Sequence, residues 1–424
     1  MRSSRAPQPG ASAQTVAVVG AGVVGLCTAL QAQRQGYRVT LIDRDAPGQG
    51  ASFGNAGYLA TELIDPLSSG KTLRGALAML LDPHGPLALP LGYLHRSLPW
   101  LLRFVAAARP AQVARSRDGL LALNRAALPA WRRCLADIGA SQQLRQSGYL
   151  LVWESAGRLE EARAHARYLQ QWGVHSELVD AARVAQLEPA LAGTVKHALY
   201  FPEACQVREP YELCRQLFAA FEARGGCFVQ QAVEHLSADA QQVRVQIAGT
   251  ALSVDRAVIC AGAWSKKLLQ GTGIEVPLEA ERGYHLSLDS PVIRLNRPIG
   301  SAERRFVISP LDSGLRAVGF TELGGLRLKP IRRRGKTLRR HSQALIPALA
   351  DPSLQTSEWM GHRPTLPDSL PVIDRHPQHA RLLFAFGNQH LGLTQAAISA
   401  ELVVSLMAGE TPPIDLRPYR VDRF

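Results

Sequence analysis

The chain has 424 residues, which is enough for one large domain or two interleaved domains with a substantial core. Its hydrophobic content of 46% and charged content of 20% exclude an intrinsically disordered protein. The net charge of +13 predicts a basic surface. The one dense basic run, residues 327–340, fits an anionic lipid or nucleic-acid partner, or simply a solvated helix face. Because no aromatic residues interleave with this run, nucleic acid is disfavoured as a partner.

Neither a secretion signal nor a metal site is indicated. Residues 1–14 lack the apolar core of a signal peptide, and we expect a disordered extension there. The six cysteines form no C-x-x-C pair and no zinc-binding spacing, so no metal ligand is predicted. Free cysteines fit a reducing compartment, and we expect a cytoplasmic protein.

A membrane-spanning helix is not predicted, because no uninterrupted apolar stretch reaches about 18 residues. Residues 85–110 are the nearest approach, although prolines and charges interrupt them. This segment either lies on a membrane surface or forms a buried helix under a substrate cavity. A peripheral contact with the inner face of the plasma membrane therefore stays open.

The first clear structural unit is a βαβ unit. Residues 15–19 are a continuous apolar run rich in β-branched residues, which predicts a buried parallel strand. Residues 23–35 carry apolar residues at helical spacing and end at Gly36, a good helix C-cap. Residues 37–42 predict a second strand, closed by Asp43.

A dinucleotide-binding motif joins the first strand to the helix. Gly20, Gly22 and Gly25 stand in G-x-G-x-x-G spacing. The first glycine makes the tight turn, the second lets the backbone touch a pyrophosphate, and the third lets helix and strand pack closely. Asp43, about 20 residues on, can hold a ribose 2′-OH and would repel a 2′-phosphate. We count the neighbouring Arg44 among the cofactor-binding residues.

The rest of the chain does not continue the β–α–β alternation of a nicotinamide dehydrogenase. A mostly helical stretch to about residue 147 precedes short strands, and a final helix is predicted over 394–408. We predict an α/β (α+β) protein with a Rossmann-type nucleotide-binding domain of discontinuous segments and an inserted mixed α+β substrate domain. The nucleotide-binding segments are 15–60, 206–280 and 355–424, and the substrate segments are 61–205 and 281–354.

The layout favours FAD over NAD. The small residues of "GASFGNAG" (50–57) follow the ribose residue almost at once and let the backbone approach a flat ring. The next strand-and-glycine element, "AVICAGAW" (257–264), comes about 200 residues later. There Gly262 can close a second turn over the dinucleotide. Such an interrupted arrangement is typical of a flavin protein.

A substrate-binding arginine is predicted in "GHRPTLPDSLPVID" (361–374), which reads as a stiff proline-rich loop. The planar fork of Arg363 matches a carboxylate. The alternative is a structural ion pair, for instance with Asp368, which we expect to serve the loop itself. In "ERGYHLSL" (281–288) Tyr284 can hydrogen-bond a carboxylate, and Arg282 or His285 can line the cavity, although each also fits an ordinary strand residue. Tyr58 is a further, weaker candidate.

Four segments carry a family resemblance: "VVGAGVVG" with its distal Asp43, "GASFGNAG", "AVICAGAW", and "GHRPTLPDSLPVID" with "LLFAFGNQHLGLT". Together they resemble the FAD-dependent amine and amino-acid oxidoreductases of the D-amino-acid oxidase superfamily, and most of all the bacterial D-amino-acid dehydrogenases. The resemblance spans nearly all of residues 15–424. It implies non-covalent FAD, because no cysteine or histidine matches a site of covalent attachment.

The resemblance also assigns residues. Those implied to border the flavin are Ser52, Asn55, Ala56 and Gly57. Val233 is implied to begin the adenine-side strand. Those implied to present backbone N–H groups to the pyrimidine ring are Gly387, Gly392, Leu393 and Thr394, the last opening a helix whose positive end faces the reduced ring. Asn388 departs from the histidine that relatives often carry there, while His390 remains.

The implied activity is oxidation of the α-C–N bond of a D-amino acid. A hydride passes from Cα to flavin N5, and the imine hydrolyses to a 2-oxo acid and ammonia. Arg363 and Tyr284 are the predicted catalytic residues. A quinone, another carrier or oxygen remains open as the electron acceptor. The alternatives within the superfamily are a D-hydroxyproline dehydrogenase and a glycine or sarcosine oxidase. Outside it, the alternative is a non-catalytic nucleotide-binding or basic nucleic-acid-binding protein.

Overall fold

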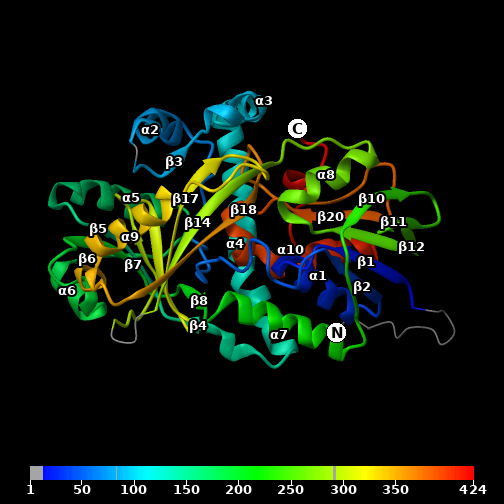
Figure 1. The fold of residues 1–424 in the computed structure, drawn as a ribbon, viewed down its shortest axis with the longest axis horizontal. Coiled ribbons are helices and arrows are strands. Elements are labelled where there is room, and N and C mark those ends of the chain that lie inside the picture. The colour runs from blue at the N-terminus through cyan, green and yellow to red at the C-terminus, as the bar shows by residue number, and fades with distance from the viewer. Residues whose placement is uncertain (1–12, 83, 290–292) are drawn as a thin grey trace.

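The computed structural model describes residues 13–82, 84–289 and 293–424. The predicted extension 1–14 therefore lies almost entirely outside the described residues. Two large β-sheets lie side by side in Figure 1, one in each half of the molecule, with the long helix α4 (Pro110–Asp137) between them. Residues from distant parts of the sequence meet in both sheets, as the discontinuous assignment predicted.

The sheet in the right half of Figure 1 has six strands in the order β19-β20-β13-β1-β2-β9. Its strands are β1 (Thr15–Val19), β2 (Arg38–Asp43), β9 (Cys227–Gln230), β13 (Arg256–Ile259), β19 (Val372–Arg375) and β20 (Leu382–Phe386). All neighbours pair in parallel except β19, which is antiparallel to β20. Because β1 lies inside this sheet, its residues from Val16 to Val19 are buried, as an uninterrupted apolar run requires.

Helix α1 (Val23–Arg34) connects β1 to β2 and packs against α10 (Gly392–Ala408). Residues Gln389–Ala408 reach a mean hydropathy of 1.5, enough in length and composition to cross a membrane. However, 72% of that window is buried inside the structure, and α10 belongs to the core. Helix α4 covers the same core, where the buried Trp131 donates from Nε1 to the carbonyl of Leu393 at 2.8 Å.

The sheet in the left half is mixed and has nine strands. They are β3 (Leu87–Ala88), β5 (Tyr149–Trp153), β6 (Glu177–Asp180), β7 (His197–Phe201), β14 (Glu279–Asp289), β15 (Ile299–Ser301), β16 (Phe306–Leu311), β17 (Gly314–Leu323) and β18 (Gln355–Thr365). The helices around it are α2 (Gly70–Leu81), α5 (Leu159–Gln171), α6 (Ala181–Leu187) and α9 (Arg333–Leu345). This is the mixed α+β part of the predicted fold.

Smaller elements complete the structure. A three-stranded antiparallel sheet contains β10 (Val233–Ala238), β11 (Val243–Ile247) and β12 (Thr250–Val254), and β4 (Leu144–Gln146) pairs with β8 (Cys205–Val207). The remaining α-helices of the described residues are α3 (Leu94–Ala107), α7 (Pro210–Ala223) and α8 (Ser265–Leu269).

One local prediction is wrong: residues 361–365 are not a loop. They end β18, which pairs antiparallel with β14 along its whole length. Pro364 fits because β18 is an edge strand, so the missing N–H removes no bond to a second neighbour. The predicted boundary at residue 355 fails for the same reason, since residues 355–365 belong to the larger sheet. The other domain boundaries stay predictions.

Candidate active site

A cavity of about 800 Å³ lies where the two sheets meet. One part of its wall comes from the carboxyl ends of the parallel strands, and the other comes from β14, β16, β17 and β18. The predicted site residues on this wall are Gly20, Gly22, Asp43, Arg44, Ser52, Asn55, Ala56, Val233, Gly262, Tyr284, Arg363, Gly387, Gly392 and Leu393. Gly25, Gly57 and Thr394 lie behind the wall.

The glycine turn after β1 has the geometry that a dinucleotide site needs. Gly20 has a φ of +110°, and a Cβ there would lie 2.4 Å from the carbonyl oxygen of Cys260. A Cβ on Gly25 would lie 1.8 Å from the carbonyl oxygen of Gly20. These two glycines therefore let α1 start directly against β1 and β13, which brings the helix N-terminus to the cavity.

The start of α1 keeps backbone donors available for an anion. The N–H groups of Gly22 and Val24 have no hydrogen-bond partner within the described ranges, and both residues line the cavity. Asp43 accepts from the N–H of Ala21 at 2.6 Å, which fixes its carboxylate beside the turn. The guanidinium of Arg44 lies 4.1 Å from the centroid of the Trp264 ring, and both side chains border the same end of the cavity. A pyrophosphate and a ribose fit this set of donors and acceptors.

The small-residue loop 50–57 is held by hydrogen bonds at several points. Ser52 Oγ accepts from the N–H of Val23 at 3.0 Å, which ties the loop to α1. Arg316, a buried residue of β17, donates from Nη1 to the carbonyls of Phe53 and Asn55 at 3.0 Å each. The side chain of Asn55 also accepts from the N–H of Gly57 at 2.9 Å. The loop is therefore a fixed surface against which a flat ring can lie.

The first turn of α10 supplies the other backbone surface. The helix begins at Gly392, two residues earlier than predicted, so Thr394 lies inside its first turn. Thr394 Oγ1 accepts from the N–H of Ala60 at 3.0 Å, while Gly392 and Leu393 line the cavity. Asn388 donates from Nδ2 to Gln395 at 3.1 Å and is held by the helix. The positive end of α10 thus faces the cavity, where it favours negative charge.

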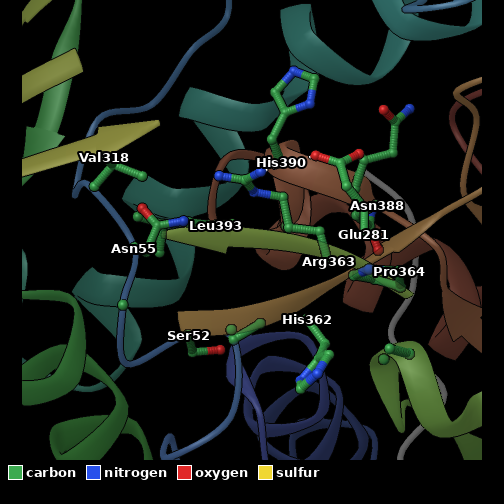
Figure 2. A pocket seen from close by; sticks show the side chains of 18 of the residues that line it. Ser52, Asn55, Glu281, Val318, His362, Arg363, Pro364, Asn388, His390 and Leu393 are labelled. Carbon is green, nitrogen blue, oxygen red and sulfur yellow. Dashed lines mark hydrogen bonds and ion pairs between the residues drawn. The ribbon is translucent and has the colours of Figure 1, made fainter. Parts of the chain in front are cut away.

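Arg363 of β18 belongs to the part of the wall that is built from side chains, and it lies beside His390 (Figure 2). It lies across from Glu281 in the β14–β18 pairing, and its Nη1 contacts Glu281 Oε1 at 2.8 Å. The same nitrogen donates to the carbonyl of Phe320 at 2.8 Å. A Cβ on Gly283 would lie 2.3 Å from Arg363 Cζ, so the guanidinium occupies the space that this glycine leaves. Nε and Nη2 of Arg363 have no hydrogen-bond partner among the residues that the structure describes.

Glu281 holds the arginine in place and was not predicted. It is buried, and besides the arginine it accepts from Thr321 at 2.9 Å and from Thr365 at 3.0 Å. Arg363 does form an ion pair, the outcome weighed as its alternative role, but the partner is Glu281 and not Asp368. Asp368 pairs with Arg423 at 2.6 Å, in the structural role expected for it.

Two histidines face the same cavity. His390 lies beside Arg363 and Glu281 in Figure 2. Burial lowers its pKa to about 4, Glu281 opposes this shift, and Arg363 adds a smaller lowering. His362 of β18 packs edge-on against Trp264 with 5.5 Å between ring centroids, and its Nε2 is buried without a partner in the described part of the chain (Figure 2). Burial also lowers its pKa to about 4. Both imidazoles are therefore neutral at pH 7 and available for hydrogen bonds.

Of the residues predicted from "ERGYHLSL", one lines the cavity and two do not. Tyr284 lines the cavity, but its hydroxyl donates to Glu322 and accepts from the N–H of Ile331 at 2.9 Å. This geometry favours Arg363 over Tyr284 as the partner of a carboxylate, and the catalytic role of Tyr284 stays a prediction. Arg282 is buried against Glu322 at 3.1 Å and does not line the cavity. His285 is also away from the cavity wall and contacts the carbonyl of Gly54 at 3.2 Å.

A second carboxyl group on the cavity wall was also missed. Glu62 is buried, lines the cavity and accepts from the hydroxyl of Tyr58 at 2.5 Å. Tyr58 itself was only a weak candidate. The sequence signal was the distance of four residues between the two, which in an extended or turning segment says little about contact.

The fold and the cavity define an enzyme that binds a dinucleotide cofactor between a Rossmann-type sheet and a mixed substrate sheet. The chain belongs to the family of FAD-dependent oxidoreductases, whose model matches residues 15–406. Its cofactor is FAD, and the backbone donors and small residues described above fit that group. Non-covalent attachment stays a prediction.

The relatives agree with this family. The chain is 32% identical over 415 residues to the D-amino-acid oxidase of Bradyrhizobium diazoefficiens, covering 96% of this chain and 98% of the relative. It is also 32% identical over 433 residues to D-amino acid dehydrogenase 2 of Ralstonia nicotianae, covering 96% of this chain and 100% of that protein.

Solved structures show the same fold. Glycine oxidase from Geobacillus kaustophilus superposes with a TM-score of 0.75 at 20% identity, covering 97% of this chain and 99% of that one. L-Proline dehydrogenase from P. horikoshii superposes with a TM-score of 0.74 at 18% identity, covering 97% and 98%. These structures confirm the predicted fold, and the family model with the two relatives confirms the predicted family.

Proposed function

We propose that the chain oxidises the α-C–N bond of a D-amino acid, producing an imine that hydrolyses to a 2-oxo acid and ammonia. The observation that carries this proposal is the position of Arg363, whose guanidinium faces the cofactor cavity with Nε and Nη2 available for a carboxylate. The names of the two curated relatives, an oxidase and a dehydrogenase of D-amino acids, support the choice of substrate.

In this proposal the two parts of the cavity wall have separate tasks. Arg363 binds the α-carboxylate, and Glu281 keeps the guanidinium over Gly283. Bound FAD supplies the acceptor for the hydride of the substrate Cα. The first turn of α10, with Gly392 and Leu393, stabilises negative charge at the adjacent part of the cavity. Neutral His390 beside Arg363 adds no competing positive charge at pH 7.

The test is anaerobic flavin reduction. The purified protein should be yellow, and D-amino acids should bleach it while their L-enantiomers do not. Arg363→Ala should lower kcat/KM by at least about 100-fold, since it removes one partner of a desolvated charge pair. Arg363→Lys should recover only part of the loss, because lysine lacks the fork. Arg417→Ala, at an exposed arginine, is the control. A yellow protein that no D-amino acid bleaches would contradict the proposal.

A panel of glycine, sarcosine and D-hydroxyproline separates the alternatives within the superfamily. Preferential bleaching by one of them would replace the D-amino acid by that substrate. For the acceptor we propose a quinone or another carrier. Turnover with an artificial dye and little peroxide under air would support a carrier, and rapid peroxide formation would support oxygen.

We also propose that the protein acts at the cytoplasmic face of an anionic membrane, through the outer surface of α3. Leu98, Leu102 and Val105 follow one another at helical spacing and are 49%, 63% and 53% exposed. The neighbouring Leu91 is 85% exposed. The inner side of α3 is fixed by Trp100, whose Nε1 donates to the carbonyl of Thr365 at 3.2 Å.

Charge supports the choice of an anionic lipid surface. Residues 66–117 contain seven lysines and arginines but one acidic residue, Asp82. The start of the basic run lies near this segment, because a Cβ on Gly325, two residues before the run, would lie 2.4 Å from the hydroxyl of Tyr93. Leu326 and Leu328 are each 38% exposed there. Apolar side chains bordered by cations are the pattern of an interfacial helix.

Co-sedimentation with phospholipid vesicles tests this surface. The protein should bind vesicles that contain anionic lipid, lose binding at high salt, and bind zwitterionic vesicles weakly. The double variant Leu98→Ser/Leu102→Ser should bind several-fold less while dye-linked activity in solution is unchanged. Equal binding by the variant and the natural protein would exclude α3 as the docking surface.

A further inference from the structure

Glu62 is an acidic group on the cavity wall that the chemistry above does not use. Its side chain is 8% exposed, and it lines the cavity together with Arg363. One carboxylate oxygen, Oε2, accepts from Tyr58 at 2.5 Å. No other residue within 13–82, 84–289 and 293–424 donates a hydrogen bond to the second oxygen, and the only further donor to the carboxyl group is the backbone N–H of Glu62 itself. A buried carboxyl group on a substrate cavity, with one oxygen that accepts from no other residue, is poised to receive a donor from the substrate.

The segment that carries Glu62 is anchored at the flavin-facing part of the cavity. The N–H of Ala60 donates to Thr394 Oγ1 in the first turn of α10. The carbonyl of Leu63 accepts from Asn124 Nδ2 at 3.0 Å, and Asn124 in turn accepts from Gln395 of α10 at 3.0 Å. A direct hydrogen bond to α10 therefore precedes Glu62 in the sequence, and a connection to α10 through Asn124 of α4 follows it. This places the carboxyl group near the helix end expected at the flavin, and not at the adenine end.

The surroundings of Glu62 contain little that stabilises its charge. Tyr58 stacks on Tyr149 of β5 with 4.3 Å between ring centroids. Burial raises the pKa of Glu62 to about 7, and the hydrogen bond from Tyr58 offsets part of that rise. The other titratable groups that face the pair are Tyr149 and Cys205, whose own pKa values are raised by burial, so both are neutral at pH 7. The same cavity is also lined by Lys71 of α2 and by Glu161 and His165 of α5.

We propose that Glu62 accepts a proton from the substrate α-ammonium group, with Tyr58 orienting the carboxylate. One N–H bond of the ammonium breaks, its electron pair stays on nitrogen, and an O–H bond forms on Glu62 Oε1. The substrate changes from ammonium to neutral amine and Glu62 from carboxylate to carboxylic acid, so charge and protons balance. The inference rests on the proposed function, because hydride loss from Cα needs the nitrogen lone pair that this step exposes.

The proposal makes the rate depend on the ionisation of Glu62. In the natural protein kcat/KM should fall as the pH drops below about 7, because protonated Glu62 cannot accept a proton. In Glu62→Gln the amide still accepts from Tyr58 but cannot take up the proton. Its kcat/KM at pH 7 should be lower by about 100-fold. The remaining rate should rise tenfold per pH unit as the free substrate loses its own ammonium proton.

Tyr58→Phe gives a signature that a purely structural pair would not produce. Because the tyrosine hydrogen bond lowers the pKa of Glu62, its removal should move the acid limb of the profile to higher pH. Flavin content and thermal stability are measured on each variant to show that it folds. Glu188→Gln is the matched control. Burial raises the pKa of Glu188 to about 7 as well, but this residue lies outside the cavity wall and accepts from the N–H of Asn296 at 2.8 Å.

Each outcome decides the proposal. The proposal is supported if the acid limb of the kcat/KM profile disappears in Glu62→Gln, moves to higher pH in Tyr58→Phe and stays unchanged in Glu188→Gln. A Glu62→Gln variant that keeps the natural pH profile overturns it. Lowered kcat/KM for D-lysine and D-arginine alone, at every pH, also overturns it, because Glu62 would then bind a cationic side chain. If the natural protein is not bleached by D-amino acids, the proposed function has failed instead.

Discussion

The two ends of the cavity are built from different material. At the cofactor end the working groups are backbone atoms, and Gly20 and Gly25 make room for them within one βαβ unit. At the substrate end they are side chains, and Arg363 meets Glu281 from 82 residues away. A glycine matters at both ends, but for different reasons. Gly25 lets two backbones touch, whereas Gly283 makes space for a guanidinium.

The largest effect is expected when the backbone-built end is filled. Gly25→Ala would place a Cβ 1.8 Å from the carbonyl oxygen of Gly20, and neither backbone can move without displacing α1 from β1. We expect a protein that is purified without FAD and is less stable by about 3 kcal/mol or more, the upper range of overpacking effects. Visible absorbance gives the FAD content, and denaturant unfolding gives the free energy.

A glycine with free space around it supplies the control for this change. Nothing lies within 4 Å of a Cβ on Gly157, which is exposed. Gly157→Ala should therefore change the free energy of unfolding by less than about 0.5 kcal/mol and keep FAD fully bound. If Gly25→Ala retained FAD like this control, close packing would not be what the glycine motif provides.

An intermediate effect is expected at the substrate end. Gly283→Ala would place a Cβ 2.3 Å from Arg363 Cζ, but the guanidinium is the end of a flexible side chain and can move. We expect FAD binding and the free energy of unfolding to be nearly unchanged. Since a misplacement of about 1 Å can cost about 100-fold, kcat/KM should fall by up to that factor, mostly through KM.

Comparing the two alanine variants separates cofactor binding from carboxylate binding more clearly than either variant alone. Gly25→Ala should remove the cofactor, while Gly283→Ala should leave a yellow protein that binds carboxylates weakly. Titration with a carboxylate inhibitor, followed by the change in the flavin spectrum, measures the second effect directly. Unaltered inhibitor affinity in Gly283→Ala would mean that Arg363 does not bind the carboxylate from its position over Gly283.

The difference between the backbone-built cofactor end and the side-chain-built substrate end also explains what could be predicted from the sequence. The βαβ unit was predictable because Gly20, Gly25 and Asp43 act within one short segment whose geometry allows few other residues. The arginine of β18 was predictable as a chemical group, but its strand was not. Pro364 disfavours a central strand, and only the pairing with β14 reveals that β18 is an edge.

Neighbouring residues on β14 show most clearly what the sequence alone could not predict. Glu281 reaches Arg363 at the cavity, whereas Arg282 is buried against Glu322 and does not line it. The β14–β17 register shifts between Arg282 and Tyr284, so simple alternation does not tell which side chain faces which side. Register and bulge depend on strands that are distant in the sequence, and the sequence pattern alone contains neither.

The smallest expected effect is on stability, at the contact between the substrate sheet and the small-residue loop 50–57. There His285 of β14 contacts the carbonyl of Gly54. Burial and, to a smaller extent, the charge of Arg316 lower the pKa of His285 to about 4, although the hydrogen bond to Gly54 opposes the shift. In the unfolded chain the pKa is about 6.5. Between these values the unfolded chain binds a proton that the native protein does not bind, so the free energy of unfolding decreases as the pH falls from about 6.5 to about 4.

This linkage predicts that His285 contributes about 2 kcal/mol to the loss of stability between pH 7 and pH 5. In His285→Asn the amide can still donate to Gly54, but the group no longer titrates. Urea unfolding of both proteins with saturating FAD at the two pH values should therefore show a smaller pH-dependent loss in the variant, whatever its stability at pH 7. An equal loss would mean that His285 takes up its proton at the same pH in the folded and the unfolded protein, so that burial does not shift its pKa.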